Sequence, residues 1–269
     1  MNKDSEPTLP SFYLADPLGY DGIALQGVTK SFQGRAVLDD LYFTIEKGET
    51  VVVIGRSGEG KSVMLKHIVR LLEPESGQIW VDGIEVNSLG KTELFELRKR
   101  FGMLFQMAAL FDSMTICENV SLGLIENSGL SESEIRDRAC ACLRMVGLVD
   151  VEEMFPVELS GGMKKRAGLA RAIAMQPNYI LYDEPTTGLD PITADAINDL
   201  ILKLQAELQV TSIVVTHDMA SAFKIADRIA MLHKGRIIYA DRVDNVRQSD
   251  NEYVRQFIAG SAQGPLGAF

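Results

Sequence analysis

The chain has 269 residues, enough for one large domain or two small ones around a sizeable core. Apolar residues make up 46% of it and charged residues 24%, proportions that exclude wholesale disorder and collagen-like structure. The net charge is -10, spread along the chain without a long acidic block. A negative net charge argues against a protein whose surface mainly binds nucleic acid.

The sequence shows no membrane span and no secretory signal. Its longest unbroken apolar runs, 107–111 and 139–143, hold five residues each, whereas a membrane helix needs about 18. The N-terminal segment lacks a basic stretch followed by an apolar core. An odd number of cysteines without paired metal spacing is typical of reduced cytosolic thiols, so we expect a cytosolic protein. These cysteines are Cys117, Cys140 and Cys142.

The first third of the chain predicts a leader and then a β-rich segment with one helix. Residues 1–22 contain three prolines and two glycines without periodicity, which indicates a loosely ordered leader. A helix is predicted for 62–72, with an apolar face and a polar face on which His67 is expected to be solvated. The predicted strands around this helix are 24–32, 37–45, 50–54, 78–82 and 101–105.

Residues 107–176 contain no convincing strand, which predicts an inserted helical subdomain. Its clearest helix begins at the capping-box pair Ser131 and Glu134 and ends at Gly147, a residue that suits a left-handed stop. The apolar stripe of this helix is Ile135, Ala139, Cys142, Leu143 and Val146.

Strands then alternate with a helix at 193–208, which predicts parallel α/β winding. The strands are 179–183, 212–216, 228–232 and 236–240, and a hairpin turn that includes a solvated His233 separates the last two. We expect one domain over 23–243, followed by a C-terminal helix and an apolar tail over 244–269.

A phosphate-binding motif follows the strand 50–54. The pattern Gly55-x4-Gly60-Lys61-Ser62 stands between an apolar strand and an amphipathic helix, the context that a phosphate loop requires. Its glycines let backbone N–H groups turn toward phosphates, and the helix N-terminus adds a positive dipole end. Lys61 can reach the β and γ oxygens of ATP, and Ser62 can ligate Mg2+. The candidate nucleotide-binding residues here are Gly55, Arg56, Ser57, Gly58, Glu59, Gly60, Lys61, Ser62 and Val63.

The segment YILYDEP predicts a buried strand that ends in two carboxylates, Asp183 and Glu184. At the carboxyl edge of a sheet, Asp183 can hold Mg2+ through water, while Glu184 can orient the attacking water and accept its proton. The alternative is a solvated acidic turn after a core strand. A phosphate loop in the same chain favours the catalytic interpretation.

A second glycine-rich helix end is predicted at 159–163, before a helix over 164–174. Ser160 can cap that helix, and Gly161 and Gly162 expose backbone N–H groups to an anion. One γ-phosphate needs only one such cradle, so the second one suggests a nucleotide held by another copy of the chain. The alternative is a glycine-rich turn that opens an ordinary helix, with Lys164, Lys165 and Arg166 on its solvated face.

Together these segments resemble the ATP-binding cassette ATPases of ABC transporters over nearly all of 23–240. The resemblance implies an α/β fold: a P-loop NTPase cassette with a RecA-like parallel-sheet core, an antiparallel β subdomain and an inserted α-helical subdomain. It also implies ATP and Mg2+ as ligands, and two head-to-tail copies that sandwich two ATP molecules between the phosphate loop of one and ELSGGMKKR of the other.

The resemblance assigns expected roles to further residues. Phe32 aligns with the aromatic residue that stacks on adenine, and Gln106 with the glutamine that senses Mg2+ and the transport partner. Asp190 ends the loop that crosses the dimer interface, and His217 aligns with the histidine at the γ-phosphate. Taken singly, Phe32 would be core, Gln106 a polar strand end and His217 a satisfied histidine, but their joint order favours the functional interpretation.

Val63 and Met163 depart from the broad family pattern, and with the surrounding segments they resemble the ATPases of MCE-type lipid transport systems, including the Mla phospholipid pathway. That resemblance implies a peripheral protein at the cytoplasmic face of the inner membrane. Its implied partners are a second copy, integral-membrane permease subunits, a small regulatory subunit and a lipid-binding MCE protein, with no nucleic acid. The apolar stretch 107–111 is a candidate docking surface, or else packs inside the helical subdomain.

Three alternatives stay open on the sequence: a transporter for another substrate, a soluble ABC ATPase that works on DNA or ribosomes, and a non-catalytic nucleotide-binding scaffold. The soluble class is expected to carry a long coiled-coil insertion or two fused cassettes, and the chain has neither. The scaffold is disfavoured because every expected catalytic position keeps its residue.

Overall fold

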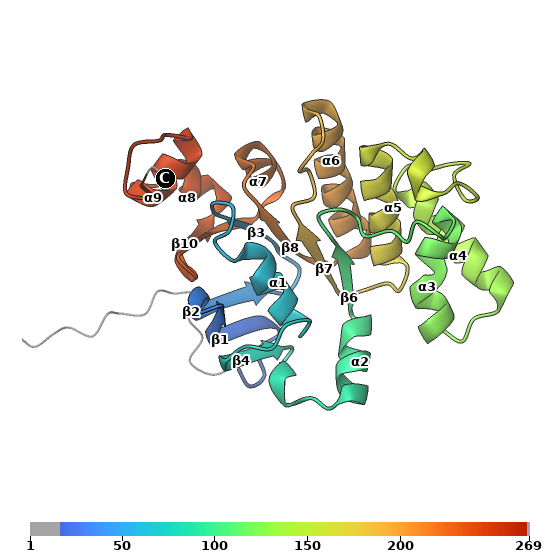
Figure 1. Ribbon diagram of the computed structural model, residues 1–269, viewed down its shortest axis with the longest axis horizontal. Helices are drawn as coiled ribbons and strands as arrows, with labels where there is room; N and C mark the ends of the chain where they lie inside the picture. The colour runs from blue at the N-terminus through green and yellow to red at the C-terminus, as the bar shows by residue number, and fades with distance from the viewer. Residues whose placement is uncertain (1–16, 268–269) are drawn as a thin grey trace, which may run out of the picture.

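Two β-sheets organise the chain in the computed structural model, which describes residues 17–267 (Figure 1). The smaller sheet is antiparallel and has the strand order β2-β1-β4-β5. Its strands are β1 (Gly22–Phe32), β2 (Arg35–Glu46), β4 (Ser76–Val81) and β5 (Ile84–Glu85). The expected antiparallel subdomain is therefore present.

The larger sheet has the order β10-β9-β3-β8-β7-β6, and all its neighbours are parallel except the β9–β10 hairpin. Its strands are β3 (Thr50–Ile54), β6 (Phe101–Leu104), β7 (Tyr179–Asp183), β8 (Thr211–Thr216), β9 (Arg228–His233) and β10 (Arg236–Arg242). These bounds match the predicted strands closely because the central strands β3, β7 and β8 are short, largely apolar runs that are buried throughout, as strands covered on both faces require. The α/β fold class is confirmed.

Alternation along β3 divides the core into two clusters. Val51 and Val53 pack with the small sheet and with helix α1 (Lys61–Ile68), while Val52 and Ile54 face the opposite cluster. Consequently α1 lies between the two sheets (Figure 1). The other face of the large sheet is covered by helices that include α6 (Pro191–Leu208) and α7 (Met219–Ile225).

The helical segment between β6 and β7 forms a lobe at one side of the molecule (Figure 1). It contains α3 (Ile116–Asn127), α4 (Glu132–Met145), η2 (Pro156–Glu158) and α5 (Gly161–Ile173). The predicted capping box is confirmed, since Ser131 accepts from the Glu134 N–H and Glu134 accepts from the Ser131 N–H. In the described part of the chain, no helix combines the length and apolar character needed to cross a bilayer.

One predicted helix was wrong in its extent, and one helix of the structure was not predicted. The expected helix 62–72 ends at Ile68, because Val69 leaves the helical region and Arg70 has a φ of 50°. A second helix, α2 (Lys91–Lys99), follows η1 (Val86–Ser88) where the sequence predicted none. The chain closes with α8 (Val243–Arg247) and α9 (Glu252–Ala259). The domain boundaries remain predictions, and residues 1–16 of the predicted leader lie outside the described residues.

His67 is buried, contrary to the predicted solvated position. Both faces of α1 are covered because the helix lies between two sheets. The sequence predicted only one covered face, because the other face carries polar residues. The ring Nδ1 lies 2.7 Å from the Val63 carbonyl oxygen. Burial lowers the pKa of His67, so the folded state favours the neutral ring.

His67 should make folding stability depend on pH. The unfolded chain binds a proton at His67 near pH 6.5, whereas the folded chain does so only at lower pH, so stability falls as the pH drops below about 6.5. The limiting slope is about 1.4 kcal/mol per pH unit. Urea unfolding at pH 7.5 and 5.5 should show a smaller difference for His67→Gln than for the wild type. Equal differences would contradict this account.

Candidate nucleotide site

Four parallel strands end at one edge of the large sheet, and each is followed by a candidate residue. The phosphate loop (residues 55–62) follows β3, Gln106 follows β6, Glu184 follows β7 and His217 follows β8. Because the carboxyl ends of parallel strands share an edge, residues as far apart in sequence as Ser62 and Asp183, 121 positions, meet there. The structure thus assembles the site that the separate motifs indicated.

The phosphate loop opens directly into α1, with Gly60 as its N-cap at a φ of 102°. A Cβ atom at Gly60 would lie 2.7 Å from the Val37 carbonyl oxygen, so both the backbone conformation and the close approach require glycine. The first turn of α1 carries no acidic residue. Its free N–H groups and positive dipole end therefore suit an anion.

Lys61 is the first residue of α1, and its ammonium is buried. Nζ donates to the carbonyls of Gly55 at 2.8 Å and Arg56 at 3.1 Å, and it lies 3.6 Å from Glu184 Oε1. Burial lowers the pKa of Lys61, and the Glu184 carboxylate opposes that effect. The two charges compensate each other in the wall of the site.

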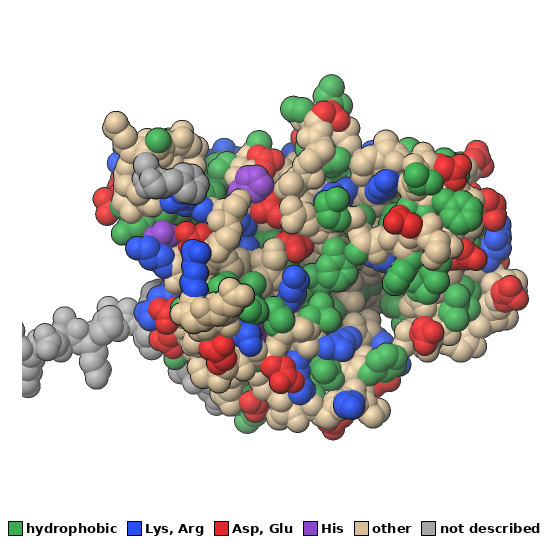
Figure 2. Space-filling model, in the orientation of Figure 1, with side chains coloured by type: hydrophobic (Ala, Val, Ile, Leu, Met, Phe, Trp, Pro, Cys, Tyr) green, Lys and Arg blue, Asp and Glu red, His purple; other side chains and the backbone are tan. Residues whose placement is uncertain are grey.

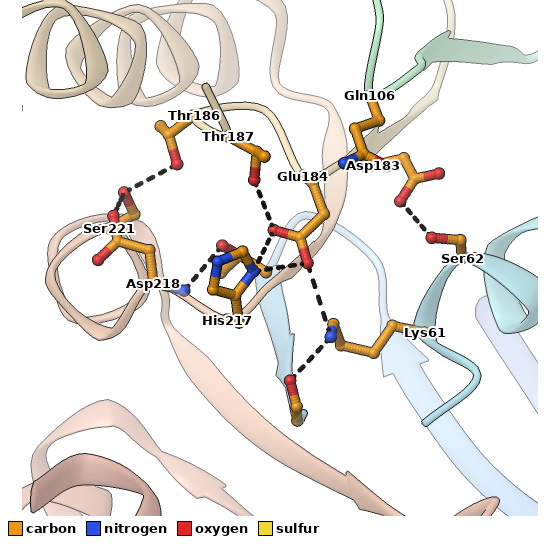
Figure 3. Close-up of polar contacts among 12 residues, drawn as sticks. Lys61, Ser62, Gln106, Asp183, Glu184, Thr186, Thr187, His217, Asp218 and Ser221 are labelled. Carbon is orange, nitrogen blue, oxygen red and sulfur yellow. Dashed lines mark hydrogen bonds and ion pairs between the residues drawn. The ribbon is translucent and has the colours of Figure 1, made fainter. Parts of the chain in front are cut away.

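Glu184 is held by contacts on several sides (Figure 3). Its carboxylate accepts from the Thr187 hydroxyl at 3.1 Å and lies 3.1 Å from His217 Nδ1. The side chain is buried, and the backbone has a φ of 49°, a conformation uncommon outside glycine. A carboxylate fixed in this way can accept a proton from a water molecule within hydrogen-bond distance.

Ser62 and Asp183 form the candidate metal-binding pair. The Ser62 hydroxyl donates to Asp183 Oδ1 at 2.6 Å (Figure 3). Hydroxyl and carboxylate oxygens are hard ligands that fit Mg2+, which normally keeps waters and substrate phosphates in its shell. Among residues 17–267 no group of three or more His, Cys, Asp or Glu side chains could hold a metal by itself. These residues therefore fit Mg2+ as a shared ligand of protein and phosphate.

A cleft of about 420 Å³ joins the candidate residues of this site. Phe32 contributes to its lining with 43% of its surface exposed, so a planar base could reach the ring. The cleft is lined by Phe32, Val37, Ser57, Gly58, Gly60, Lys61, Ser62, Val63, Gln106, Glu184 and His217. Of the other residues of the phosphate loop, Gly55 and Arg56 contribute carbonyls to Lys61, and Glu59 accepts from the Lys234 N–H.

The second glycine-rich helix end does not line this cleft. Ser160 caps α5 as predicted, accepting from the Met163 N–H at 3.3 Å, and α5 begins at Gly161 rather than 164. A Cβ atom at Gly162 would lie 2.5 Å from Thr193 Cγ2, so α5 approaches α6 closely there. Asp190 caps α6 through the N–H groups of residues 192 and 193.

Besides His67, two further positions expected to be solvated are buried in the structure. Lys165 is 5% exposed, and its Nζ donates to the carbonyls of Gln106 and Glu184. The prediction failed because α5 packs on nearly all sides, with Gly162 and Leu169, three before and four after Lys165, also buried. The run of three cations, 164–166, does not show which of them faces inward.

His233 is the second buried exception, although the predicted hairpin is confirmed. Its Nδ1 lies 3.2 Å from Glu59 Oε1, and its ring is 5.7 Å from that of Tyr253. The hairpin turn exposes Lys234 instead. The prediction was wrong because α9, distant in sequence, covers the end of β9.

A glycine-rich phosphate loop, a paired hydroxyl and carboxylate, and a buried glutamate at one sheet edge define a nucleotide-binding ATPase cassette. The family model for the ABC transporter family matches residues 38–187. The chain belongs to the ABC transporter family, as an ATP-hydrolysing subunit of a membrane transport system.

Known relatives agree with this assignment. The chain is 42% identical to the probable ribonucleotide transport ATP-binding protein mkl of Mycobacterium tuberculosis, over 93% of this chain and 70% of that protein. It is 40% identical to the intermembrane phospholipid transport system ATP-binding protein MlaF of Haemophilus influenzae, over 91% and 92%. The dimeric post-hydrolysis structure of the ATP-binding cassette MJ0796, bound to ADP and Pi, is similar with a TM-score of 0.77 and 36% identity over 82% and 98%.

The C-terminal tail contacts the phosphate loop of its own chain. Arg56 donates to the carbonyls of Leu266 at 3.0 Å and Gly267 at 3.3 Å. The buried Gln256 of α9 holds the tail in a closed turn, donating to the Ser261 carbonyl at 3.0 Å and accepting from the Leu266 N–H at 2.8 Å. The apolar tail therefore packs against its own phosphate loop, a contact that the sequence did not predict.

Gln256→Ala should release the tail. Loss of two hydrogen bonds of about 1 kcal/mol each raises the open population roughly tenfold or more. Trimming of the C-terminal residues by carboxypeptidase, followed by mass spectrometry, should accelerate accordingly. Gln263→Ala is the matched control, because its side chain is exposed. Identical trimming of both variants and the wild type would show that Gln256 does not hold the tail.

Proposed function

We propose that this chain powers phospholipid transport by hydrolysing ATP in the cleft beside the phosphate loop, with Glu184 as the general base. The observation that carries the proposal is the placement of Glu184. Its buried carboxylate faces Lys61, Thr187 and His217 in the wall of that cleft. A general base must be fixed within reach of the water whose proton it takes.

In this mechanism Lys61 and the N-terminus of α1 stabilise the negative charge of the β- and γ-phosphates. Glu184 takes the proton of the attacking water, and His217 orients the carboxylate and contacts the γ-phosphate. Phe32 stacks on adenine, and Gln106 senses Mg2+ and the transport partner. Ser62, Gln106 and Asp183 would hold Mg2+; the ion supplies charge neutralisation on the phosphate oxygens when it is bound.

We further propose that two copies complete each site. Ser160, Gly161, Gly162 and Asp190 lie outside the lining of their own cleft, at the N-termini of α5 and α6. The glycine-rich N-terminus of α5 carries backbone N–H groups that suit a phosphate, whereas Asp190 itself accepts from the first N–H groups of α6. Support also comes from the similar cassette that was solved as a dimer with ADP and Pi. Binding of ATP would then close the dimer, and hydrolysis would reopen it.

A groove between α2, β6 and the helical lobe is the proposed docking site for a permease subunit. The groove has a volume of about 610 Å³. Figure 2 shows a hollow between the helical lobe and the rest of the molecule, with hydrophobic and cationic side chains at its edge. Phe95 and Phe111 line it with 48% and 54% of their surfaces exposed, and Met107 beside it is 85% exposed. Ala108 is buried, so only part of the candidate stretch 107–111 packs inward.

Phospholipid as cargo is supported by the resemblance to MlaF over 92% of its length. The name of mkl refers to ribonucleotides, so membership of the family does not decide the cargo. Val63 and Met163, together with the segments around them, favour the lipid class. The proposed complex holds the chain at the cytoplasmic face of the inner membrane and adds permease subunits, a lipid-binding MCE protein and a small regulatory subunit.

The assigned roles of Glu184 and Lys61 predict different defects. Glu184→Gln should lower kcat for ATP about 100-fold or more while leaving ATP affinity within about threefold, and should accumulate ATP-bound dimers on size-exclusion chromatography. Lys61→Ala should instead weaken ATP affinity. Glu207→Gln and Lys66→Ala are the matched controls on α6 and α1. Wild-type turnover by Glu184→Gln would refute its role as general base.

The cargo can be tested on the complex itself. Purification of the tagged chain from membranes of its own host, without added lipid, should recover an integral-membrane partner. Mass spectrometry of the extracted complex should then detect more phospholipid per complex than in an unrelated permease complex that is purified in parallel as a control. Recovery of ribonucleotide without phospholipid enrichment would overturn the lipid proposal and leave the ATPase assignment intact.

A further inference from the structure

Lys165 connects the helical lobe to two of the four strand ends that form the nucleotide cleft, those of β6 and β7. It lies one turn into α5 and is 5% exposed. Its Nζ donates to the main-chain carbonyl of Gln106 at 2.5 Å and to that of Glu184 at 3.1 Å. The side chains of these two acceptor residues line the cleft, while their carbonyls meet on a single ammonium group.

Packing alone does not account for a lysine at this position. Among the described residues, no carboxylate lies within ion-pair distance of Lys165 Nζ, so two carbonyl dipoles take the place of a salt bridge. Burial lowers the pKa of Lys165, and the carboxylates of Asp183 and Glu184 oppose that effect. A buried ammonium is costly, and an apolar chain of similar length would fill the space without that cost.

The backbone of Glu184 needs support because its φ of 49° lies in the left-handed region. Its N–H donates to the Val215 carbonyl at 2.9 Å. Its carbonyl accepts from the Thr187 N–H at 3.3 Å and from Lys165. Hydrogen bonds therefore hold the peptide groups on both sides of Glu184. Of their partners, Lys165 is the one that belongs to the helical lobe.

We propose that Lys165 is a positioning residue for ATP hydrolysis. Its ammonium fixes the main chain at Gln106 relative to that at Glu184, so that side chains from two strand ends reach the cleft in one arrangement. The proposal rests on the role of Glu184 as general base. Phosphate binding depends on Lys61 and the phosphate loop, which Lys165 does not contact, so its loss affects the chemical step and spares ATP binding.

The test compares Lys165→Met with Lys203→Met, an exposed lysine of α6 that lies outside the cleft and the proposed interface. We expect Lys165→Met to lower kcat about 10- to 100-fold, because small misplacements of catalytic groups have effects of this size. The KM and the affinity for ATP should stay within about threefold. Lys203→Met should match the wild type. If Lys165→Met does not fold, as judged by circular dichroism, Lys165→Gln replaces it.

A double variant separates positioning from general damage. Because Lys165 acts through Glu184, Lys165→Met combined with Glu184→Gln should lose less turnover than the product of the two single losses. Two results would overturn the proposal: losses that multiply in the double variant, or an unchanged kcat for a folded Lys165→Met protein. In either case, loss of turnover in Glu184→Gln alone would still support the role of Glu184. Turnover by Glu184→Gln would instead refute the role on which the proposal rests.

Discussion

Parallel pairing of β6, β7, β8 and β3 is the constraint on which the site depends. It brings four carboxyl strand ends to one edge, so that the phosphate loop, Gln106, Glu184 and His217 share a cleft although they come from widely separated parts of the chain. No single segment could form this site, because each contributes only the one or two residues that follow its strand. The helices stabilise the sheet that carries this edge by covering both of its faces.

The two faces of the sheet have different tasks. On one face, α1 lies between the sheets, which fixes the helix N-terminus and Lys61 at the phosphate loop and buries His67. On the other face, α5 and α6 carry the glycine-rich helix end and Asp190 toward the surface. The phosphate-binding end is therefore rigidly packed within one chain, whereas the second helix end is available to another copy, as the proposed dimer requires.

Ion pairs and hydrogen bonds across the cleft link its parts to distant segments. Lys61 and Glu184 compensate each other's charge, Lys165 joins α5 to two strand ends, and Arg56 reaches the C-terminal tail. These contacts give the helical lobe and the tail a physical route to the nucleotide site. Movement of either segment would alter the main chain beside the proposed phosphate site without changing the residues proposed to bind there.

The sequence by itself determined every strand except the two-residue β5, the phosphate loop, the capped helix after Ser131 and the candidate residues, because each depends on local spacing and periodicity. Only the tertiary structure decided which polar side chains are buried. Lys165, His67 and His233 were all expected in solvent, yet each is covered by elements distant in sequence. Burial of a polar group depends on neighbours that supply hydrogen bonds from elsewhere in the chain, and a local pattern contains no record of them.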